Sequence, residues 1–220
     1  IGADSRIGSK FLDSGPGFGG SCFKKDILNL VYLCEYFGLP EVGNFWNSVV
    51  ELNTWHQNRI SNLIINKLYG TLSGKNIIIL GFAFKANTND TRESSAIQIC
   101  KNLIEEGAIL RIHDPKVEIS QISKDLNLSP SNSINKDKNT SKDGEWYSFK
   151  NLENIFNNAD AVLILTEWND YTKINWFNAS KEMRSPAWVF DARSILDPQK
   201  VINAGLNFWR VGDGLDRNIR

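Results

Sequence analysis

The 220-residue chain carries 25 basic and 25 acidic side chains, so it has no net charge, and 41% of its residues are hydrophobic. This balance argues against a nucleic-acid or anionic-membrane surface, so any anion binding should depend on a few placed Arg or Lys side chains. No apolar run approaches the roughly 20 residues of a membrane span. Three scattered cysteines make no disulfide framework, which favours a reducing, cytoplasmic location.

A glycine-rich turn follows the first 14 residues. The chain opens on Ile1 without an initiator methionine or a signal peptide, which predicts a fragment whose N-terminal part is missing. Residues 1–14 show little periodicity. Four glycines then fall within residues 15–20, and they let the backbone adopt positive φ angles and come close to a ligand.

The helix that follows this turn begins with the main candidate site. Apolar spacing predicts a helix from Phe23 to Phe37, so Cys22 stands at its start, where unpaired N–H groups favour a thiolate. Lys24 and Lys25 add positive charge. Asp26 should share a helical face with Cys22. A thiolate, a carboxylate and a glycine turn suit covalent catalysis, while a small buried cysteine in a turn is the alternative interpretation.

A second, longer helix is predicted from Glu41 to Tyr69, after the helix-breaking Gly38-Leu39-Pro40. It would be about 40 Å long, more than a small domain needs for itself. Such a helix often connects domains or forms a subunit interface. A helix that lies on the core of its own domain fits the periodicity equally well.

The pattern changes after residue 72. Short apolar runs alternate with helical ones, which predicts βαβ units and a parallel sheet with helices on both faces. Residues 129–143 are polar and repetitive and indicate a solvated surface loop. The fold class is therefore α/β, with a helical segment at 1–72 and a Rossmann-like domain at 73–220. The predicted strands are 76–81, 109–113, 161–165, 188–190 and 208–211, and the predicted helices are 94–106 and 151–158.

In such sheets, ligands bind beyond the carboxyl ends of the strands. The loop after the first predicted strand lacks a G-x-G-x-x-G fingerprint, but its Lys85 and Arg92 suit a phosphate or a diphosphate. Asp114 ends the second strand and could bind a ribose or begin an Asp-Pro turn, of which the turn is favoured. Arg193 follows the fourth strand and could reach the same crevice or form a salt bridge on the rim.

The other chemically notable residues are interpreted mainly as structural. His56 and His113 are too few and too far apart for a metal cluster, so no metal is predicted, and His56 is expected on an exposed helix face. Cys34 and Cys100 fall on apolar helix faces and are expected in the core. Trp168 could line a pocket beyond the third predicted strand.

With these residues in hand, the chain resembles the C-terminal half to two-thirds of the UDP-glucose 6-dehydrogenases, a branch of the UDP-glucose/GDP-mannose dehydrogenase family. The resemblance runs from Ile1 to Val211. Its most specific motif is the cysteine loop. The motifs are Gly17-Phe18-Gly19-Gly20-Ser21-Cys22-Phe23 with Lys25-Asp26, Gly81-Phe82-Ala83-Phe84-Lys85, Asp90-Thr91-Arg92-Glu93-Ser94 and Phe190-Asp191-Ala192-Arg193.

The resemblance implies two NAD-dependent oxidations that convert UDP-glucose to UDP-glucuronate. Cys22 would attack the intermediate aldehyde and carry a thiohemiacetal and then a thioester, and Asp26 would orient or activate the hydrolytic water. The α/β domain would bind the UDP-sugar. The implied substrate-binding residues are Arg6 (acting in a neighbouring subunit), Asp13, Ser14, Gly15, Pro16, Gly17, Phe18, Gly19, Phe84, Lys85 and Arg193, and those implied to contact NAD are Lys25 and Arg92.

The resemblance also implies a homo-oligomer, at least a dimer joined through the long helix. The family's N-terminal NAD-binding domain, with its G-x-G-x-x-G and an assisting lysine, is absent from this chain, so the fragment alone is expected to be inactive. Two alternatives stay open: a dehydrogenase of another nucleotide sugar, such as a UDP-N-acetyl sugar or GDP-mannose, and a non-catalytic module that binds nucleotide sugars.

Overall fold

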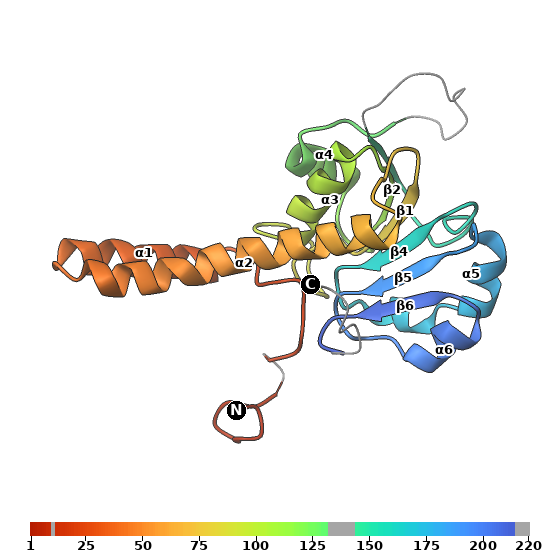
Figure 1. The fold of residues 1–220 in the computed structure, drawn as a ribbon. Helices are drawn as coiled ribbons and strands as arrows, with labels where there is room; N and C mark the ends of the chain where they lie inside the picture. Colours follow the sequence, from red (N-terminus) through yellow and green to blue (C-terminus); the bar gives the residue numbers. More distant parts are fainter. Residues whose placement is uncertain (10–11, 132–143, 214–220) are drawn as a thin grey trace.

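The structure, a computed structural model, describes residues 1–9, 12–131 and 144–213. A parallel sheet with helices on both faces forms the body of the molecule, and a helical hairpin projects from it (Figure 1). The expected α/β class is therefore confirmed. The sheet has six strands in the order β3-β2-β1-β4-β5-β6, with bounds β1 Asn76–Leu80, β2 Ile109–His113, β3 Glu145–Ser148, β4 Ala161–Ile164, β5 Trp188–Asp191 and β6 Asn207–Arg210.

The hairpin consists of α1 (Phe23–Tyr36) and α2 (Pro40–Lys67), which match the two predicted N-terminal helices to within two residues at each end. Gly38 has a φ of 72° and ends α1, and Pro40 occupies the first turn of α2, where its missing N–H leaves no helical bond unmade. The outer half of α2 packs on α1, while its last three turns enter the core of the sheet domain through residues such as Ile60 and Ile64.

The sheet reverses its direction of growth between β1 and β4. β2 pairs with one edge of β1, Asn76 opposite Ile109, and β4 pairs with the other edge, Ile77 opposite Ala161. This reversal is the topological switch point, beyond which such sheets bind their ligands. Five of the six strands match predicted ones, but β3 at Glu145–Ser148 was missed because this short edge strand follows a long polar stretch.

The helices that connect the strands are α3 (Ser95–Glu105), α4 (Ile119–Leu126), α5 (Trp176–Glu182) and α6 (Pro198–Asn203), with a short 3-10 helix at Asn169–Lys173. Only α3 was predicted. The helix expected at 151–158 is wrong: these residues form turns, with Asn154 and Asn158 at positive φ. The buried guanidinium of Arg111 takes the carbonyls of Ile155 and Asn157, so they are not committed to helical hydrogen bonds.

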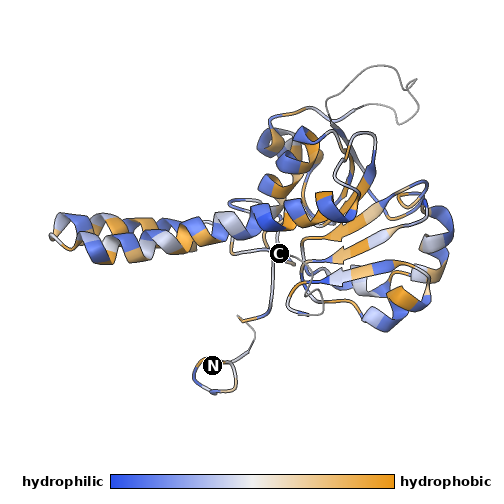
Figure 2. Cartoon of the chain, in the orientation of Figure 1, coloured by the Kyte–Doolittle hydropathy of each residue, from blue (hydrophilic) through white to orange (hydrophobic). Residues whose placement is uncertain are grey.

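The core has two layers because alternate residues of each strand face opposite sides of the sheet. Ile77 and Ile79 pack with α2, α3 and α4, whereas Ile78 and Leu80 pack with α5 and α6. Figure 2 shows the hydrophobic strands between these helices. No helix in the described part of the chain is long and apolar enough to cross a membrane. Residues 132–143, most of the predicted surface loop, lie outside the described residues.

Candidate active site at the carboxyl edge of the sheet

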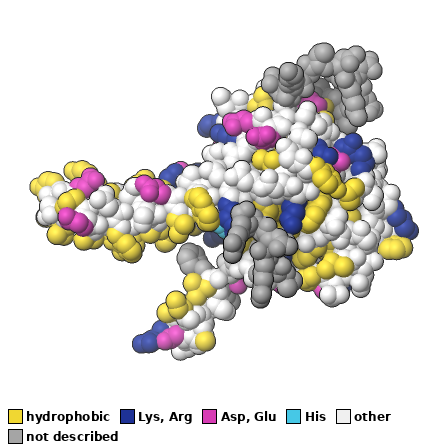
Figure 3. Space-filling view, viewed as in Figure 1, with side chains coloured by type: hydrophobic (Ala, Val, Ile, Leu, Met, Phe, Trp, Pro, Cys, Tyr) yellow, Lys and Arg dark blue, Asp and Glu magenta, His cyan; other side chains and the backbone are white. Residues whose placement is uncertain are grey.

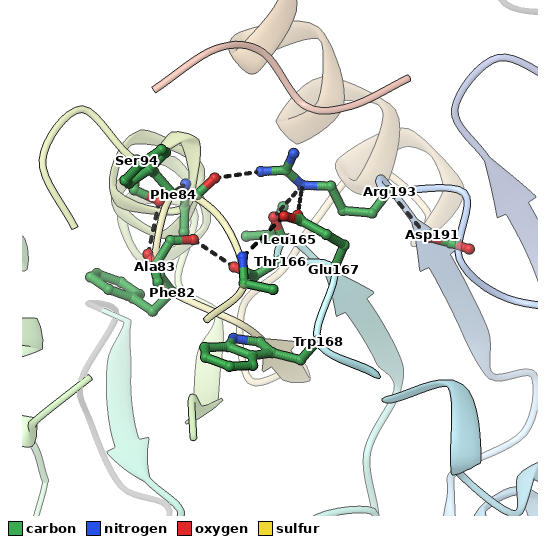
Figure 4. Close-up of polar contacts among 12 residues, drawn as sticks. Phe82, Ala83, Phe84, Ser94, Leu165, Thr166, Glu167, Trp168, Asp191 and Arg193 are labelled. Atoms are coloured by element: carbon green, nitrogen blue, oxygen red, sulfur yellow. Dashed lines mark hydrogen bonds and ion pairs between the residues drawn. The ribbon is translucent and has the colours of Figure 1, made fainter. Parts of the chain in front are cut away.

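Three loops meet at the carboxyl ends of β1, β4 and β5 (Figure 4). Gly81 ends β1 with a φ of 95°, and a Cβ added there would lie 2.3 Å from Cβ of Thr166. Thr166 donates its hydroxyl to the carbonyl of Ala83 at 2.6 Å, and Ser94 donates to the carbonyl of Phe82 at 2.8 Å. These contacts place the loop after β1 tightly against the loop after β4.

Asp114 organises the loop after β1 from the end of β2. Its Oδ2 accepts the backbone N–H groups of Phe82 and Ala83 at 2.7 and 3.0 Å and the indole N–H of Trp168 at 3.3 Å. Its Oδ1 accepts two more N–H groups of the turn that follows it. The favoured interpretation of Asp114 as a turn residue therefore agrees with the structure. Trp168, suggested above as a pocket residue, is buried and packs in the core.

Arg193 enters the crevice from the turn after β5. The buried carboxylate of Asp191 shapes this turn by accepting the N–H groups of Arg193 and Leu196 at 3.0 and 2.8 Å. Burial raises the pKa of Asp191, and those backbone hydrogen bonds oppose the rise. The Arg193 guanidinium donates from Nε to the carbonyl of Leu165 at 2.7 Å and from Nη2 to the carbonyl of Phe84 at 2.9 Å. The guanidinium thus joins all three loops.

The glycine turn of residues 15–20 packs directly onto this crevice. A Cβ on Gly15 would lie 3.2 Å from Nη1 of Arg193, and one on Gly19 would lie 2.4 Å from the carbonyl oxygen of Glu93. Gly20 donates its N–H to the carbonyl of Arg92 at 2.8 Å and lies against the ring of Phe84. The absence of side chains at these glycines lets the turn approach the sheet domain.

One face of α2 holds the other side of the turn. Asn53 accepts the N–H of Phe18 at 2.9 Å and donates to its carbonyl at 3.1 Å. Gly17 has a φ of 119°, and a Cβ there would lie 2.5 Å from Oδ1 of Asn53. His56 Nε2 lies 3.0 Å from the carbonyl oxygen of Gly15, so this nitrogen carries the donated proton. The expectation that His56 is exposed was wrong, because this contact leaves it half-buried.

Cys22 stands at the end of the turn nearest to α1, and it is exposed, which contradicts the alternative of a small buried cysteine. Its Sγ lies 3.6 Å from the hydroxyl of Ser21, and its carbonyl accepts the N–H of Asp26 in the first turn of α1. Arg92 lies close by, and a hydrogen bond to Asp90 is the main cause of the raised pKa of its guanidinium. The Lys24 ammonium pairs with Glu93 at 2.8 Å.

Some of the predicted site residues come together and others do not. Gly15, Gly17, Phe18, Gly19, Phe84 and Arg193 share the crevice and the turn that covers it, with Pro16 buried between them. The ammonium of Lys85 is exposed and lies 5.4 Å from the centre of the Phe84 ring. The remaining predicted residues lie at the surface. Asp13, Ser14, Lys25 and Asp26 are exposed, and Arg6 pairs with Asp4 in the N-terminal segment that extends away from the domain (Figure 1).

Sequence reasoning missed Asn53, Gln57 and Glu167. Asn53 and Gln57 lie four residues apart with His56 between them, and such a polar stripe on a long helix is a signal that could have been used. Glu167 comes two residues after a predicted strand, in the loop where ligand-binding residues usually lie. Cys34 and Cys100 are buried as expected, and burial raises the pKa of the Cys100 thiol. Within the described residues, no cluster of three His, Cys, Asp or Glu side chains could hold a metal ion.

The chain combines a parallel sheet with a glycine turn that packs at the switch point and leads to an exposed cysteine. Two family models match it. Residues 78–198 match the model of the UDP-glucose/GDP-mannose dehydrogenase family, UDP binding domain, and residues 1–55 match that of the central domain of the same family. The chain belongs to the UDP-glucose/GDP-mannose dehydrogenase family.

Within that family, the chain is similar to proteins named UDP-glucose 6-dehydrogenase. It is 44% identical to the one from Drosophila melanogaster and 42% identical to the one from Caenorhabditis elegans, in each case over 99% of this chain. These alignments cover 45% and 44% of the two relatives, so the chain spans less than half of their length.

Solved structures show the same fold. A UDP-glucose dehydrogenase from Pyrobaculum islandicum aligns with a TM-score of 0.69 and 25% identity, over 94% of this chain and 40% of that one. An NDP-N-acetyl-D-galactosaminuronic acid dehydrogenase from Methanosarcina mazei aligns with a TM-score of 0.65 and 21% identity, over 90% of this chain and 39% of that one. At 21% identity, the likeness to the Methanosarcina mazei structure shows the fold alone.

Proposed function

We propose that the full-length protein that contains this chain oxidises UDP-glucose to UDP-glucuronate and uses two NAD per sugar. The observation that carries the proposal is the exposed sulfur of Cys22 on the turn that packs against Phe84 and Arg193. A nucleotide sugar bound beside this turn would have a nucleophile at the edge of its site.

We assign the nucleotide sugar to the crevice at the switch point. Arg193 lies at its base and Lys85 on its rim, and both are cations that suit a diphosphate. The backbone from Asp13 to Gly19 would wrap the sugar nucleotide, since glycines allow close approach. We further propose that residues 1–72 form a central helical segment that carries the cysteine and that residues 73–220 form the UDP-binding domain.

The covalent steps follow from the chemistry of a thiol. Sγ of Cys22 adds to the C6 aldehyde left by the first oxidation, and the thiol proton goes to the new hydroxyl of a thiohemiacetal. The second oxidation removes a hydride from that carbon and a proton from the hydroxyl, which leaves a thioester. Water, oriented by Asp26, adds to the thioester, and the C–S bond breaks to release the carboxylate and the thiol.

NAD, when bound, accepts the hydride in each oxidation, which no side chain of this chain can do. The residues present fit part of such a cofactor: Lys25, three residues after Cys22, and Arg92 are exposed cations that suit a diphosphate. We assign the rest of the NAD site to the longer protein.

We also propose that two copies of the protein join through α2, in the cytoplasm, where the three thiols stay free. Hydrophobic side chains cover much of the projecting hairpin (Figure 3), among them Phe45, Leu52 and Trp55, each more than half exposed. A second copy that covered them would also place an N-terminal segment beside its neighbour, where Arg6 could contact substrate.

The test is the NADH yield of the full-length protein with limiting UDP-glucose. Wild type should release about two NADH per sugar, and Cys22→Ala should lower the turnover rate by about a thousandfold or more, as expected when a covalent nucleophile is lost. Cys34→Ala is the matched control, because Cys34 is a buried thiol on the same helix, and it should leave the yield unchanged.

A yield of one NADH per sugar in wild type, with an aldehyde as the product, would contradict the proposal. UDP-N-acetylglucosamine and GDP-mannose should react at least about tenfold more slowly than UDP-glucose, because the site must fit both the C2 substituent and the base. A faster reaction with either would reassign the substrate within the same family.

A further inference from the structure

Glu167 links two of the three loops at the crevice, and no role has been assigned to it above. It lies in the loop after β4, between the loop after β1 and the turn of Arg193 (Figure 4). Its Oε1 accepts the N–H of Ala86 at 3.0 Å, and its Oε2 lies 3.3 Å from Nε of Arg193. Oε2 is buried and accepts no hydrogen bond within the described residues, so the charge of Arg193 is its main compensation.

The contacts of Arg193 explain why a carboxylate is needed there. The Nε proton points at the carbonyl of Leu165, so the contact between Oε2 and Nε is an attraction of charges rather than a hydrogen bond. Burial lowers the pKa of Arg193, and the charge of Glu167 is the influence that raises it. The carboxylate therefore offsets part of the penalty for holding a guanidinium where its side chain is only 16% exposed.

The same contacts determine which part of the guanidinium can meet a ligand. Nε and Nη2 are committed to the carbonyls of Leu165 and Phe84. Nη1 makes no hydrogen bond within the described part of the chain, and it lies beside Gly15 of the glycine turn. A long Arg side chain loses much rotamer freedom when it is held in one geometry, so a fixed anion behind it matters for where Nη1 points.

We infer that Glu167 is a positioning residue: it holds Arg193 and the backbone at Ala86 in the arrangement that receives the nucleotide sugar. This inference rests on the proposed function of the crevice. An opposing effect exists, because the carboxylate also neutralises a cation that would attract a diphosphate. We expect positioning to be the larger effect, because Oε2 contacts the guanidinium at Nε, whereas Nη1, the nitrogen left for a ligand, lies beside the glycine turn.

The test compares Glu167→Gln with wild type in the full-length protein. The amide can still accept from Ala86, but it removes the charge behind Arg193. The KM for UDP-glucose should rise about tenfold, as for the loss of a charged contact, with kcat and the KM for NAD within about twofold of wild type. Asp170→Asn is the matched control: Asp170 lies three residues further on in an exposed pair with Lys173, and its loss should leave both KM values unchanged.

A double-mutant cycle separates positioning from general stability. In an Arg193→Gln background, Glu167→Gln should change the KM for UDP-glucose by less than about twofold, because its effect acts through Arg193. Glu167→Asp keeps the charge and should fall between wild type and Glu167→Gln. If Glu167→Gln does not fold, the same cycle is run with Glu167→Asp, whose smaller rise in KM should likewise vanish without Arg193.

Three results would overturn the inference. The KM for UDP-glucose could stay unchanged in Glu167→Gln, or it could fall, which would mean that the carboxylate only masks charge. The third is a full tenfold rise in that KM when Glu167→Gln is made in the Arg193→Gln background. Failure of the proposed function itself would look different, since wild type would then release one NADH per sugar or none.

Discussion

The projecting half of the hairpin and the sheet domain use their hydrophobic residues in opposite ways. Every side chain of β1 is buried, and the two faces of the sheet are covered by helices from the same chain. In the hairpin, Tyr36 and Phe37 are each 71% exposed, although α1 packs against the outer half of α2. The sheet domain therefore buries most of its large hydrophobic side chains, whereas the hairpin leaves many of its own exposed.

The difference is the basis of the proposed dimer. Scattered apolar side chains are ordinary on a surface, but a row of aromatic residues along one extended element indicates an interface. The candidate site lies where α2 passes from the hairpin to the sheet domain, and Asn53 and His56 hold the glycine turn at that junction.

The largest effect is expected from Gly81→Ala, which tests how tightly the sheet domain is closed on itself. The new Cβ would require a positive φ and would overlap Thr166, so we expect a loss of about 4 kcal/mol in the free energy of unfolding. Gly74→Ala is the matched control: its φ is also positive, at 70°, but no atom lies within 4 Å of the added Cβ. That variant should lose only about 1 kcal/mol.

Chemical denaturation of the full-length variants, followed through the tryptophans of the sheet domain, gives both values. Equal losses for the two glycines would show that the loop after β1 can move away from Thr166, and the close packing of the crevice would then not constrain the site.

A smaller effect, on association rather than on folding, is expected from the double variant Phe45→Glu with Leu52→Glu. Both side chains are exposed on the hairpin, at 63% and 62%. If they meet a second copy, the charges should weaken the dimer by about a hundredfold in dissociation constant, measured by analytical ultracentrifugation. Phe177→Glu is the matched control: it is 61% exposed on α5 of the sheet domain and should leave association unchanged.

A dimer that survives both hairpin charges, or one that dissociates on Phe177→Glu, would move the interface away from α2. The hairpin and the sheet domain would then differ only in how much of their hydrophobic side chains is exposed, and not in whether they bind a second copy.

The sequence predicted the long-range architecture better than it predicted the local connections. The apolar run at 77–80 is as short and as rich in Ile as a buried strand, and the glycine and proline at 38–40 mark the hairpin turn, so these predictions are confirmed. The segment 151–158 was misassigned because a tertiary contact, the guanidinium of Arg111, takes carbonyls that a helix would use. Periodicity cannot reveal such a contact.

The residues of the candidate site also fall into those that the sequence reveals and those that only the fold reveals. Cys22 and the glycines were visible because their residue types and spacing are unusual, whereas Asn53, His56 and Glu167 act through backbone groups that are far away in sequence. The contact of Asn53 with Phe18 spans 35 positions, and that of Glu167 with Ala86 spans 81. Only the fold brings such groups together, so supporting residues of this kind are found from a structure.

The smallest expected effect concerns His113, the buried histidine of the sheet domain, at the end of β2. Its Nδ1 lies 3.1 Å from the hydroxyl of Tyr171, which donates to the carbonyl of His113, so Nδ1–H is the donor of this pair. Burial lowers the pKa of His113, and the charges of Asp114 and Asp170 and the backbone of Lys150 oppose this only in part.

The unfolded chain therefore binds the proton of His113 more readily than the folded one. Stability should be full above about pH 6.5, should decline as the pH falls from there towards the lower pKa of the folded state, and should level off below that pKa. Melting temperatures between about pH 7.5 and pH 5 should show this decline in wild type and in His56→Gln, which retains His113, but a flatter profile in His113→Gln. The carboxylates of Asp4 and Asp90, whose pKa values are lowered by their Arg partners, titrate below this window and cannot produce the same decline. An equally steep profile in His113→Gln would mean that protons enter the sheet domain elsewhere, and that its core is less closed to water than the burial of β2 indicates.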